Sequence, residues 1–256
     1  ADKQMIEDAG FEVGHLVSGA GAQQLGYAQH TAGSVQNVGE DEKTQHILLA
    51  KPVVPIDITE NWNFVLRALI PFIDQPDSGP IDGKTGVGDI TLQSYFVPKK
   101  TESLGGGNFW TWGVGPVLQF DTASDDILGT GRNAAGIGGV LFGKINNWAV
   151  GALLNNVWDV DSSRTREGVN LMTAQPFVNY NLDNGWYLKT DPVITYNQKA
   201  GSGNKWTIPV GGGFGRVFNW GKQAVKWSVT AYWLAEKPDG GANAQLQASL
   251  VFLFPK

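Results

Sequence analysis

The chain has 256 residues, 17% of them charged, and a formal net charge of −5 at pH 7. The acidic balance argues against a broad basic nucleic-acid surface, and the charged fraction is below the roughly 25% of ordinary soluble domains. Cysteine is absent, which excludes disulfides and thiolate chemistry, and no run of about 18 apolar residues predicts a transmembrane helix.

The first 44 residues carry the weakest pattern in the chain. Two stretches, "FEVGHLVSGA" and "AQQLGYAQH", are candidates for one strand, and "GSVQNVGEDEKT" is expected to be a polar loop. We therefore expect residues 1–44 to supply a first strand and a loop, preceded by a tail or plug. Residues 45–256 form the remainder of the same domain, since no boundary is visible after residue 44.

From residue 45 onward, apolar and polar side chains alternate with a period of two, which is typical of strands with two different faces. In "WNFVLRALIPF", for example, Trp62, Phe64 and Leu66 oppose Asn63 and Arg67. Eleven such segments follow one another: 45–55, 62–73, 87–97, 108–120, 134–143, 147–158, 169–180, 186–197, 205–217, 224–236 and 245–254.

The length of these segments favours strands that cross a membrane. Most have 10–13 residues, whereas strands of soluble proteins usually have about 5–6 and a tilted membrane strand needs about 9–11. Tryptophans at or near the segment ends fit the aromatic girdles of membrane barrels. The ordinary alternative is burial in a large β core. The expected interface residues are Trp62, Trp110, Trp148, Trp158, Trp186, Trp206, Trp227 and Trp233.

Long and short connections largely alternate along the chain, as in barrels with short periplasmic turns and long external loops. The long connections 74–86, 121–133, 159–168, 198–204 and 237–244 are expected outside. Because open sheet edges cannot face hydrocarbon and single-chain bacterial barrels have even strand numbers, a twelfth strand is expected within residues 1–44. The prediction is an all-β fold: a single closed antiparallel up-and-down transmembrane β-barrel with twelve strands.

Polar residues on the inner face of such a barrel are the candidate functional residues. Charges of both signs can form a selectivity field in a water-filled passage, or they can pair across the barrel and close it. The expected lumen set is Lys51, Arg67, Asp89, Gln93, Tyr95, Gln119, Asn155, Gln175, Lys189, Asp191, Lys226 and Tyr232.

Other polar clusters carry weaker signals. The loop residues Asp121, Asp125, Asp126, Asp159 and Asp161 have oxygens that Ca²⁺ accepts, but their spacing fits no EF-hand loop, and solvated charge is the favoured interpretation.

Histidines and glycine runs give no catalytic pattern. No spacing joins His15, His30 or His46 to a serine nucleophile, so neither an enzyme nor a metal site is expected. The glycine runs 136–139 and 211–215 lack the strand–turn–helix setting of a phosphate loop, and curvature or close side-chain approach is the favoured interpretation.

Several segments have a familiar order along the chain: "GVGDITLQSYF", "WGVGPVLQF", "QPFVNYNL", "GWYLKTDPVITYN", "WTIPVGGGFGRVF" and the closing "FLFPK". Together they resemble the meta-pathway phenol-degradation family of outer-membrane proteins, and the resemblance covers about residues 45–256. The segment "FDTASDD" stands where the family more often has Pro-Thr-Ala. The resemblance implies an outer-membrane barrel that acts as a small-molecule channel, and the family's name implies a link to aromatic degradation.

The expected function is therefore a passive channel for small solutes, apolar or aromatic ones among them, in the bacterial outer membrane. Its partners would be outer-membrane lipid and the solute, with no nucleic acid and no cofactor; the sequence sets no oligomeric state. Three alternatives stay open: a structural or adhesion barrel with a closed lumen and functional external loops, an outer-membrane enzyme, and a soluble secreted β protein that binds sugar.

Overall fold

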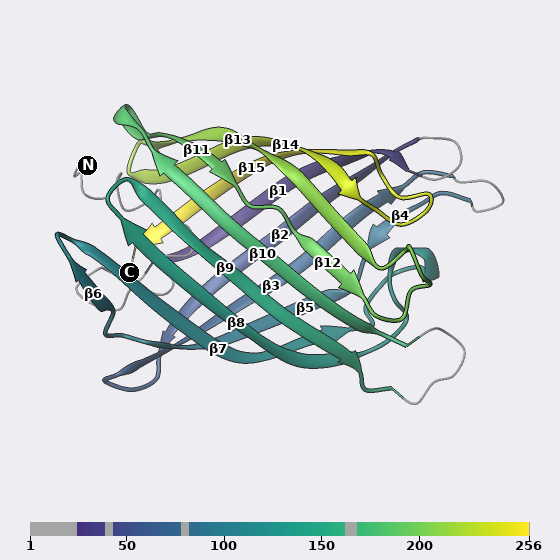
Figure 1. Cartoon of the computed structure of the whole chain (residues 1–256), viewed down its shortest axis with the longest axis horizontal. Helices are drawn as coiled ribbons and strands as arrows, with labels where there is room; N and C mark the ends of the chain where they lie inside the picture. Colours follow the sequence, from purple (N-terminus) through teal and green to yellow (C-terminus); the bar gives the residue numbers. More distant parts are fainter. Residues whose placement is uncertain (1–24, 39–42, 78–81, 162–167, 256) are drawn as a thin grey trace.

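The computed structural model of the chain describes residues 25–38, 43–77, 82–161 and 168–255. Within these ranges the chain is almost entirely β-structure, and fifteen strands belong to one antiparallel sheet (Figure 1). The strands are β1 (Leu25–Val38), β2 (Lys43–Asp57), β3 (Trp62–Gln75), β4 (Lys84–Val87), β5 (Ile90–Pro98), β6 (Glu102–Gly105), β7 (Asn108–Phe120), β8 (Ala134–Ile145), β9 (Trp148–Asp159), β10 (Asn170–Asn181), β11 (Trp186–Thr190), β12 (Ile194–Asn197), β13 (Trp206–Trp220), β14 (Gln223–Glu236) and β15 (Ala244–Pro255). Two short 3-10 helices, η1 (Asp126–Leu128) and η2 (Asp183–Gly185), lie in connections.

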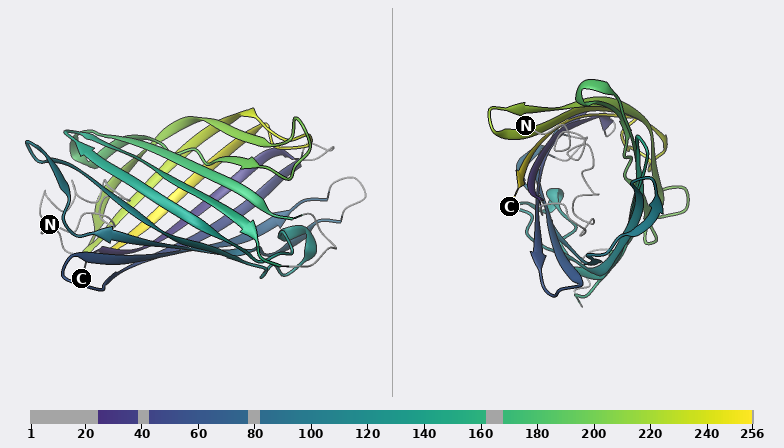
Figure 2. Two further views of the ribbon diagram at one scale, coloured as in Figure 1. Left: turned by 60° about the horizontal axis from the view of Figure 1, so that its bottom comes forward. Right: turned by 90° about the vertical axis from the view of Figure 1, so that its left-hand side faces the viewer.

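The sheet closes on itself. Each long strand pairs with its neighbours in chain order, β15 pairs with β1, and β10 links β9 to the β11–β13 side. We call each strand position around the wall a stave. Strands β11 and β12 both lie between β10 and β13 and together form one interrupted stave. Strands β4 and β6 are short additions to β3 and β7. The wall therefore has twelve staves, and its end-on outline is a ring (Figure 2). The predicted twelve-strand closed barrel is confirmed.

Three details of the predicted strand pattern are wrong. Residues 33–38, expected in a polar loop, belong to β1, and residues 43–44 begin β2. The candidate "AQQLGYAQH" overlaps the start of β1, whereas "FEVGHLVSGA" lies outside the described residues. The predicted segment 87–97 is divided: β5 starts only at Ile90, and Val87 belongs to β4, which begins inside the expected loop 74–86 and pairs with β3.

The third error concerns the segment 186–197, which is interrupted between Thr190 and Ile194. Pro192 lies in this gap and has no N–H group to donate to a sheet ladder, which explains why pairing stops there. The stave resumes because β12 pairs again with β10 and β13.

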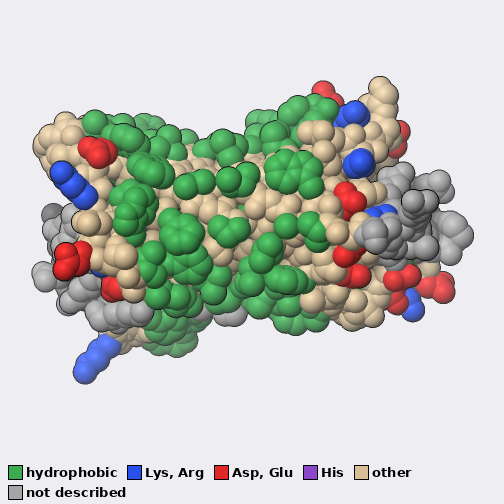
Figure 3. Space-filling view, turned by 90° about the horizontal axis from the view of Figure 1, so that it is seen from below, with side chains coloured by type: hydrophobic (Ala, Val, Ile, Leu, Met, Phe, Trp, Pro, Cys, Tyr) green, Lys and Arg blue, Asp and Glu red, His purple; other side chains and the backbone are tan. Residues whose placement is uncertain are grey.

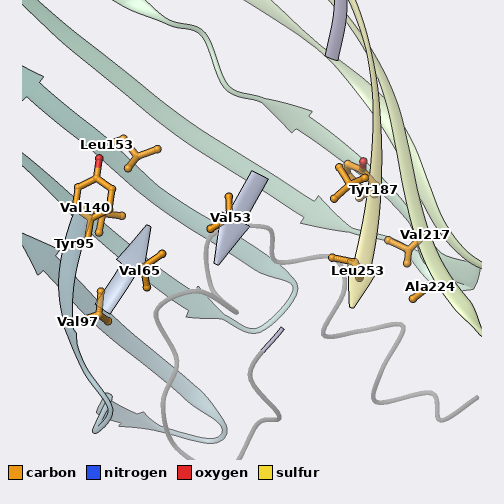
Figure 4. Close-up of a cluster of buried hydrophobic side chains, with 11 residues drawn as sticks. Val53, Val65, Tyr95, Val97, Val140, Leu153, Tyr187, Val217, Ala224 and Leu253 are labelled. Carbon is orange, nitrogen blue, oxygen red and sulfur yellow. The ribbon is translucent and has the colours of Figure 1, made fainter. Parts of the chain in front are cut away.

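The period-two pattern separates an inner face from an outer face. In β7, for example, Thr111 and Val117 are buried whereas Trp112 and Leu118 are exposed. Much of the inner face is apolar and packed: the largest buried cluster includes Val53, Tyr95, Leu153, Tyr187 and Leu253, which come from well-separated staves (Figure 4). The interior is thus partly filled by side chains rather than being uniformly polar.

Glycine lets one large side chain lie flat against the inner wall. Tyr187 on β11 is directly opposite Gly215 on β13, and its hydroxyl donates a hydrogen bond to the Trp227 carbonyl oxygen at 2.9 Å. A Cβ atom at Gly215 would overlap both the Tyr187 ring and that carbonyl oxygen. The glycine run 211–215 therefore includes a position that a neighbouring side chain approaches closely.

The outer wall presents large apolar side chains to its surroundings. Hydrophobic side chains cover the middle of the face in Figure 3, and Lys, Arg, Asp and Glu gather towards its two ends. Ile137, Leu141, Leu154 and Val210 are each exposed by more than half of their surface. A soluble protein rarely exposes a continuous apolar band of this kind, whereas lipid contact requires one.

Tryptophans mark both borders of this outer wall. Trp62, Trp110, Trp148, Trp186 and Trp227 lie near the strand ends on the side where β1 begins and β15 ends, and Trp158, Trp206 and Trp233 near the opposite ends. Trp227 and Trp62 are partly buried and the other six are exposed. Trp148 and Trp158 are ten residues apart on β9. At about 3.3 Å per residue and a tilt near 40°, this separation spans about 25 Å, the height of the apolar band of membrane barrels.

Most of the long connections lie at one end of the barrel, although the β5–β7 connection, which contains β6, lies at the other. Strands β1, β3, β7, β9, β12 and β14 end at one end of the barrel, and the short β8–β9, β10–β11 and β13–β14 turns lie at the other, with the end of β15 (Figures 1 and 2). We call these the loop end and the turn end. Among the described residues, no helix has the length and apolar character needed to span a bilayer.

Candidate functional site in the barrel lumen

A cavity of about 280 Å³ lies inside the barrel, between its middle and the loop end. Six of the twelve predicted lumen residues line it: Arg67, Asp89, Gln93, Gln119, Asn155 and Gln175. Its apolar lining consists of Leu49, Leu69, Pro71, Val117, Leu153, Val157, Leu171 and Val193. Thr91 and Thr173 complete the lining. The cavity thus has a mixed lining of polar and apolar side chains.

Arg67 is the cationic group of this cavity. It lies on β3 opposite Gln93 on β5, and its Nη1 donates a hydrogen bond to Gln93 Oε1 at 3.0 Å. Tyr95 also donates to Gln93 Oε1, at 3.4 Å, so this oxygen is shared. Arg67 Nε is buried without a hydrogen-bond partner. No ion pair joins Arg67 to a carboxylate in the described part of the chain.

Asp89 lies at the loop-end side of the cavity and binds the connection between β7 and β8. Its Oδ2 accepts hydrogen bonds from Thr130 N at 2.7 Å, Thr130 Oγ1 at 2.8 Å and Gln119 Nε2 at 3.4 Å. Its Oδ1 accepts one from Ala123 N at 3.3 Å. A carboxylate that satisfies two backbone N–H groups fixes the position of the segment that carries them.

The connection held by Asp89 folds towards the lumen. It contains η1, whose Leu128 is buried, and in the end-on view η1 lies within the outline of the ring (Figure 2). Asp125 caps η1 by accepting a hydrogen bond from Ile127 N at 3.3 Å, and it pairs with Lys84 at 3.7 Å. This ordered segment narrows the loop-end mouth of the barrel.

We expect Asp89→Ala to release this connection. The substitution removes the acceptor of two short hydrogen bonds from Thr130, and hydrogen bonds to charged groups contribute about 1.5–3 kcal/mol each. A loss of about 2 kcal/mol in local opening free energy would make trypsin cleavage after Arg132 about thirtyfold faster. Asp121→Ala, in the same connection but exposed, is the matched control. Equal cleavage rates in the two variants would show that Asp89 does not hold the segment.

A second polar group surrounds the interrupted stave. Lys189 Nζ lies 3.0 Å from Asp191 Oδ2, and the Tyr232 hydroxyl donates to Asp191 Oδ1 at 2.8 Å. Asp191 N donates back to the Tyr232 hydroxyl oxygen at 3.0 Å. Tyr232 thereby provides the backbone partner that the interrupted stave lacks at this point. Sequence alternation had placed all three residues inside the barrel without indicating that they bind one another.

The remaining predicted lumen residues, Lys51, Tyr95 and Lys226, do not line the cavity. All three are buried, and the Lys226 ammonium lies 4.5 Å from the centre of the Tyr187 ring. The structure therefore divides the predicted lumen set into a cavity group, the Lys189–Asp191–Tyr232 network and these three packed side chains.

The acidic loop residues bind protein groups of their own. Asp161 Oδ2 accepts from Asn133 N at 2.7 Å, and Asp159 Oδ2 lies 3.7 Å from Arg132 Nη1. Within the described ranges, no group of three or more His, Cys, Asp or Glu side chains has the arrangement of a metal site. His46 is exposed on β2, His30 lies on β1, and His15 falls outside the described residues.

Sequence reasoning missed several residues of the site. Thr91 and Thr173 line the cavity and follow the same alternation as Gln93 and Gln175, so the signal for them was present. Thr130, the main partner of Asp89, lies in an irregular connection where no periodicity indicates its position.

Comparison with models of protein families and with curated proteins gives no match. Among solved structures, the chain is similar to the COG4313 outer membrane channel of Pseudomonas putida F1, at 16% identity and a TM-score of 0.63, over 90% of this chain and 94% of that one. The β domain of the Bordetella autotransporter BrkA gives 13% identity and a TM-score of 0.40, over 89% and 98% of the two chains. OmpF of Salmonella typhi gives 11% and 0.39, over 91% and 98%. The first likeness shows that this chain has the fold of that outer-membrane barrel; the other two are too loose to support an argument.

Proposed function

We propose that this protein is a passive channel of the bacterial outer membrane for small solutes, apolar or aromatic ones among them, and that it is not an enzyme. The observation that carries the proposal is the cavity of about 280 Å³ inside a closed barrel with an apolar outer wall. The likeness to the Pseudomonas putida barrel supports it, because that protein is described as an outer membrane channel.

The residues suggest how a solute would pass. The mouth at the loop end is narrowed by the connection that Asp89 holds. Beyond it, a solute would meet the apolar wall of Leu153, Val157 and Leu171 and then the Arg67–Gln93 pair. Polar lining groups such as Gln93 and Gln119 already bind other side chains, so their contacts with a solute would be weak enough for release, as conduction requires.

Motifs such as "GVGDITLQSYF" and "GWYLKTDPVITYN" resemble the phenol-degradation family, and an aromatic solute fits the mixed apolar and polar lining of the cavity. Residues 74–86, 121–133, 159–168, 198–204 and 237–244 would then be external, with the short turns in the periplasm.

A closed structural or adhesion barrel is the second candidate, and the packing of β14 favours it. Lys226, Ser228 and Thr230 face inward and are only 1–4% exposed. In that case activity would reside in the connections at the loop end. The packing along β14 would block a solute path only if it extended across the whole lumen.

Ion selectivity tests the role that we assign to Arg67. Two unit charges 4 Å apart in water interact by about 1 kcal/mol. Arg67→Gln should therefore lower the ratio of chloride to potassium permeability by at least about fivefold, because one cation is lost from the path. The measurement is the reversal potential across a planar bilayer under a KCl gradient.

Arg216→Gln is the matched control for this experiment. Arg216 is exposed on β13 and lies outside the lumen, with its guanidinium 5.3 Å from the Trp186 ring. The Arg216→Gln substitution removes the same charge from the protein without changing the passage. An unchanged reversal potential in Arg67→Gln, or an equal shift in both variants, would count against Arg67 as a selectivity residue.

A further inference from the structure

Arg67 lacks a partner that its position calls for. Its Nε atom is buried and makes no hydrogen bond, and within the described residues its one hydrogen bond runs from Nη1 to a neutral amide, Gln93. Burying a charged donor without an acceptor is costly, and such groups in proteins usually have a bound partner. A ligand that reaches Arg67 from the cavity would supply the missing acceptor.

The geometry of the guanidinium indicates which acceptor fits. Gln93 accepts from Nη1, so an acceptor for the buried Nε would bind along the edge that carries Nε and Nη2. Two parallel N–H groups on one edge of a guanidinium match the two oxygens of a carboxylate. The unsatisfied edge therefore favours a planar carboxylate over a single-point acceptor.

The other charged group of the cavity does not compete for Arg67. Asp89 precedes Gln93 by four residues on the same strand side, so it lies about 13 Å along the wall from the Arg67–Gln93 pair. Both Asp89 oxygens already accept hydrogen bonds, from Thr130 and Ala123 among others. The cavity is consequently polarised, with an unpaired cation at one end and a satisfied carboxylate at the other.

The rest of the lining sets the size and character of the ligand. Side chains of Val117, Leu153, Val157 and Leu171 offer apolar contact, and Thr173 and Asn155 offer isolated polar contact. A volume of about 280 Å³ is at the lower limit of small-molecule sites, which favours compact ligands over lipids and long chains. A compact apolar body attached to one carboxylate would satisfy both parts of the lining.

We infer that this cavity is a binding subsite for small monocarboxylates with an aromatic or other compact apolar body, held by Arg67 through the carboxylate. The inference rests on the proposed channel function for its biological meaning, since it names the class of solute that pauses in the passage. Binding itself does not require that the passage conducts.

Calorimetric titration of the folded full chain in detergent micelles tests the subsite, with micelle blanks subtracted. The probes are sodium benzoate, the neutral isostere benzamide, and sodium acetate, which has the carboxylate without the apolar body. Benzoate should bind with a millimolar or lower dissociation constant, and about ten- to a hundredfold more tightly than either other probe. Equal binding of benzoate and benzamide, or no benzoate binding, would overturn the inference.

Two variants assign the effect to Arg67. Arg67→Gln should lose about tenfold or more in benzoate affinity and should no longer prefer benzoate to benzamide, whereas Arg216→Gln should keep both. Equal losses in the two variants would overturn the inference. A protein that binds benzoate in this way but carries no current in a bilayer would refute the channel function and leave the subsite standing. Current without a preference for benzoate would refute only the subsite.

Discussion

Leu154→Arg should prevent or strongly weaken folding into lipid. Leu154 is 54% exposed on the outer face of β9, and it lies between Trp148 and Trp158, near the middle of the apolar wall. An arginine at the midplane of a membrane barrel costs about 2–4 kcal/mol. The free energy of unfolding from lipid vesicles, measured by urea titration, should fall by this amount.

Leu104→Arg is the matched control for the lipid-facing wall. Leu104 is 56% exposed in β6, at the turn end beyond the Trp110 position, so the same change in a similarly exposed leucine should alter stability by less than about 0.5 kcal/mol. If both variants fold equally well, the outer wall does not face hydrocarbon, and the soluble secreted alternative returns.

Gly215→Ala should destabilise the barrel by about 2–4 kcal/mol. The new Cβ atom would overlap the Tyr187 ring and the Trp227 carbonyl oxygen. Overpacking typically costs about 1–3 kcal/mol, and displacing Tyr187 would also remove its hydrogen bond to Trp227, which contributes about 1 kcal/mol. The urea midpoint of unfolding from vesicles measures the change.

Gly139→Ala provides the comparison, because it is the same substitution in another strand of the wall. A Cβ atom at Gly139 would have its nearest neighbour, the Gly113 carbonyl oxygen, at 3.7 Å, which is ordinary contact. This variant should be as stable as the parent or slightly more stable. Equal destabilisation of both variants would show that the loss at Gly215 does not come from the contact with Tyr187.

The architecture was predictable because a membrane barrel repeats one simple constraint along the whole chain. Every stave must alternate between lipid and lumen, so segments such as 108–120 and 224–236 carry the period-two signal over their full length. Strand β1 was misplaced because its sequence, "LGYAQHTAGSVQNV", is rich in polar and small residues and carries little alternation. Its position is set by pairing with β15 and β2, which is non-local information.

The lumen was predictable in composition and not in arrangement. Alternation indicates that Arg67 and Lys226 share the inner face, but not that Arg67 borders a cavity while Lys226 is packed against Tyr187. Those differences depend on which staves are opposite one another and on how connections fold back. The Asp89–Thr130 contact, which joins residues 41 positions apart, is an example.

Single-channel conductance in a planar lipid bilayer tests the central claim most directly. The purified full chain should give steady, discrete current steps in KCl, because the lumen contains a cavity lined by Arg67, Gln93 and Gln175 within a closed wall. Verified insertion into the bilayer without any current would contradict the channel function. It would favour a closed structural barrel whose activity lies at the loop end.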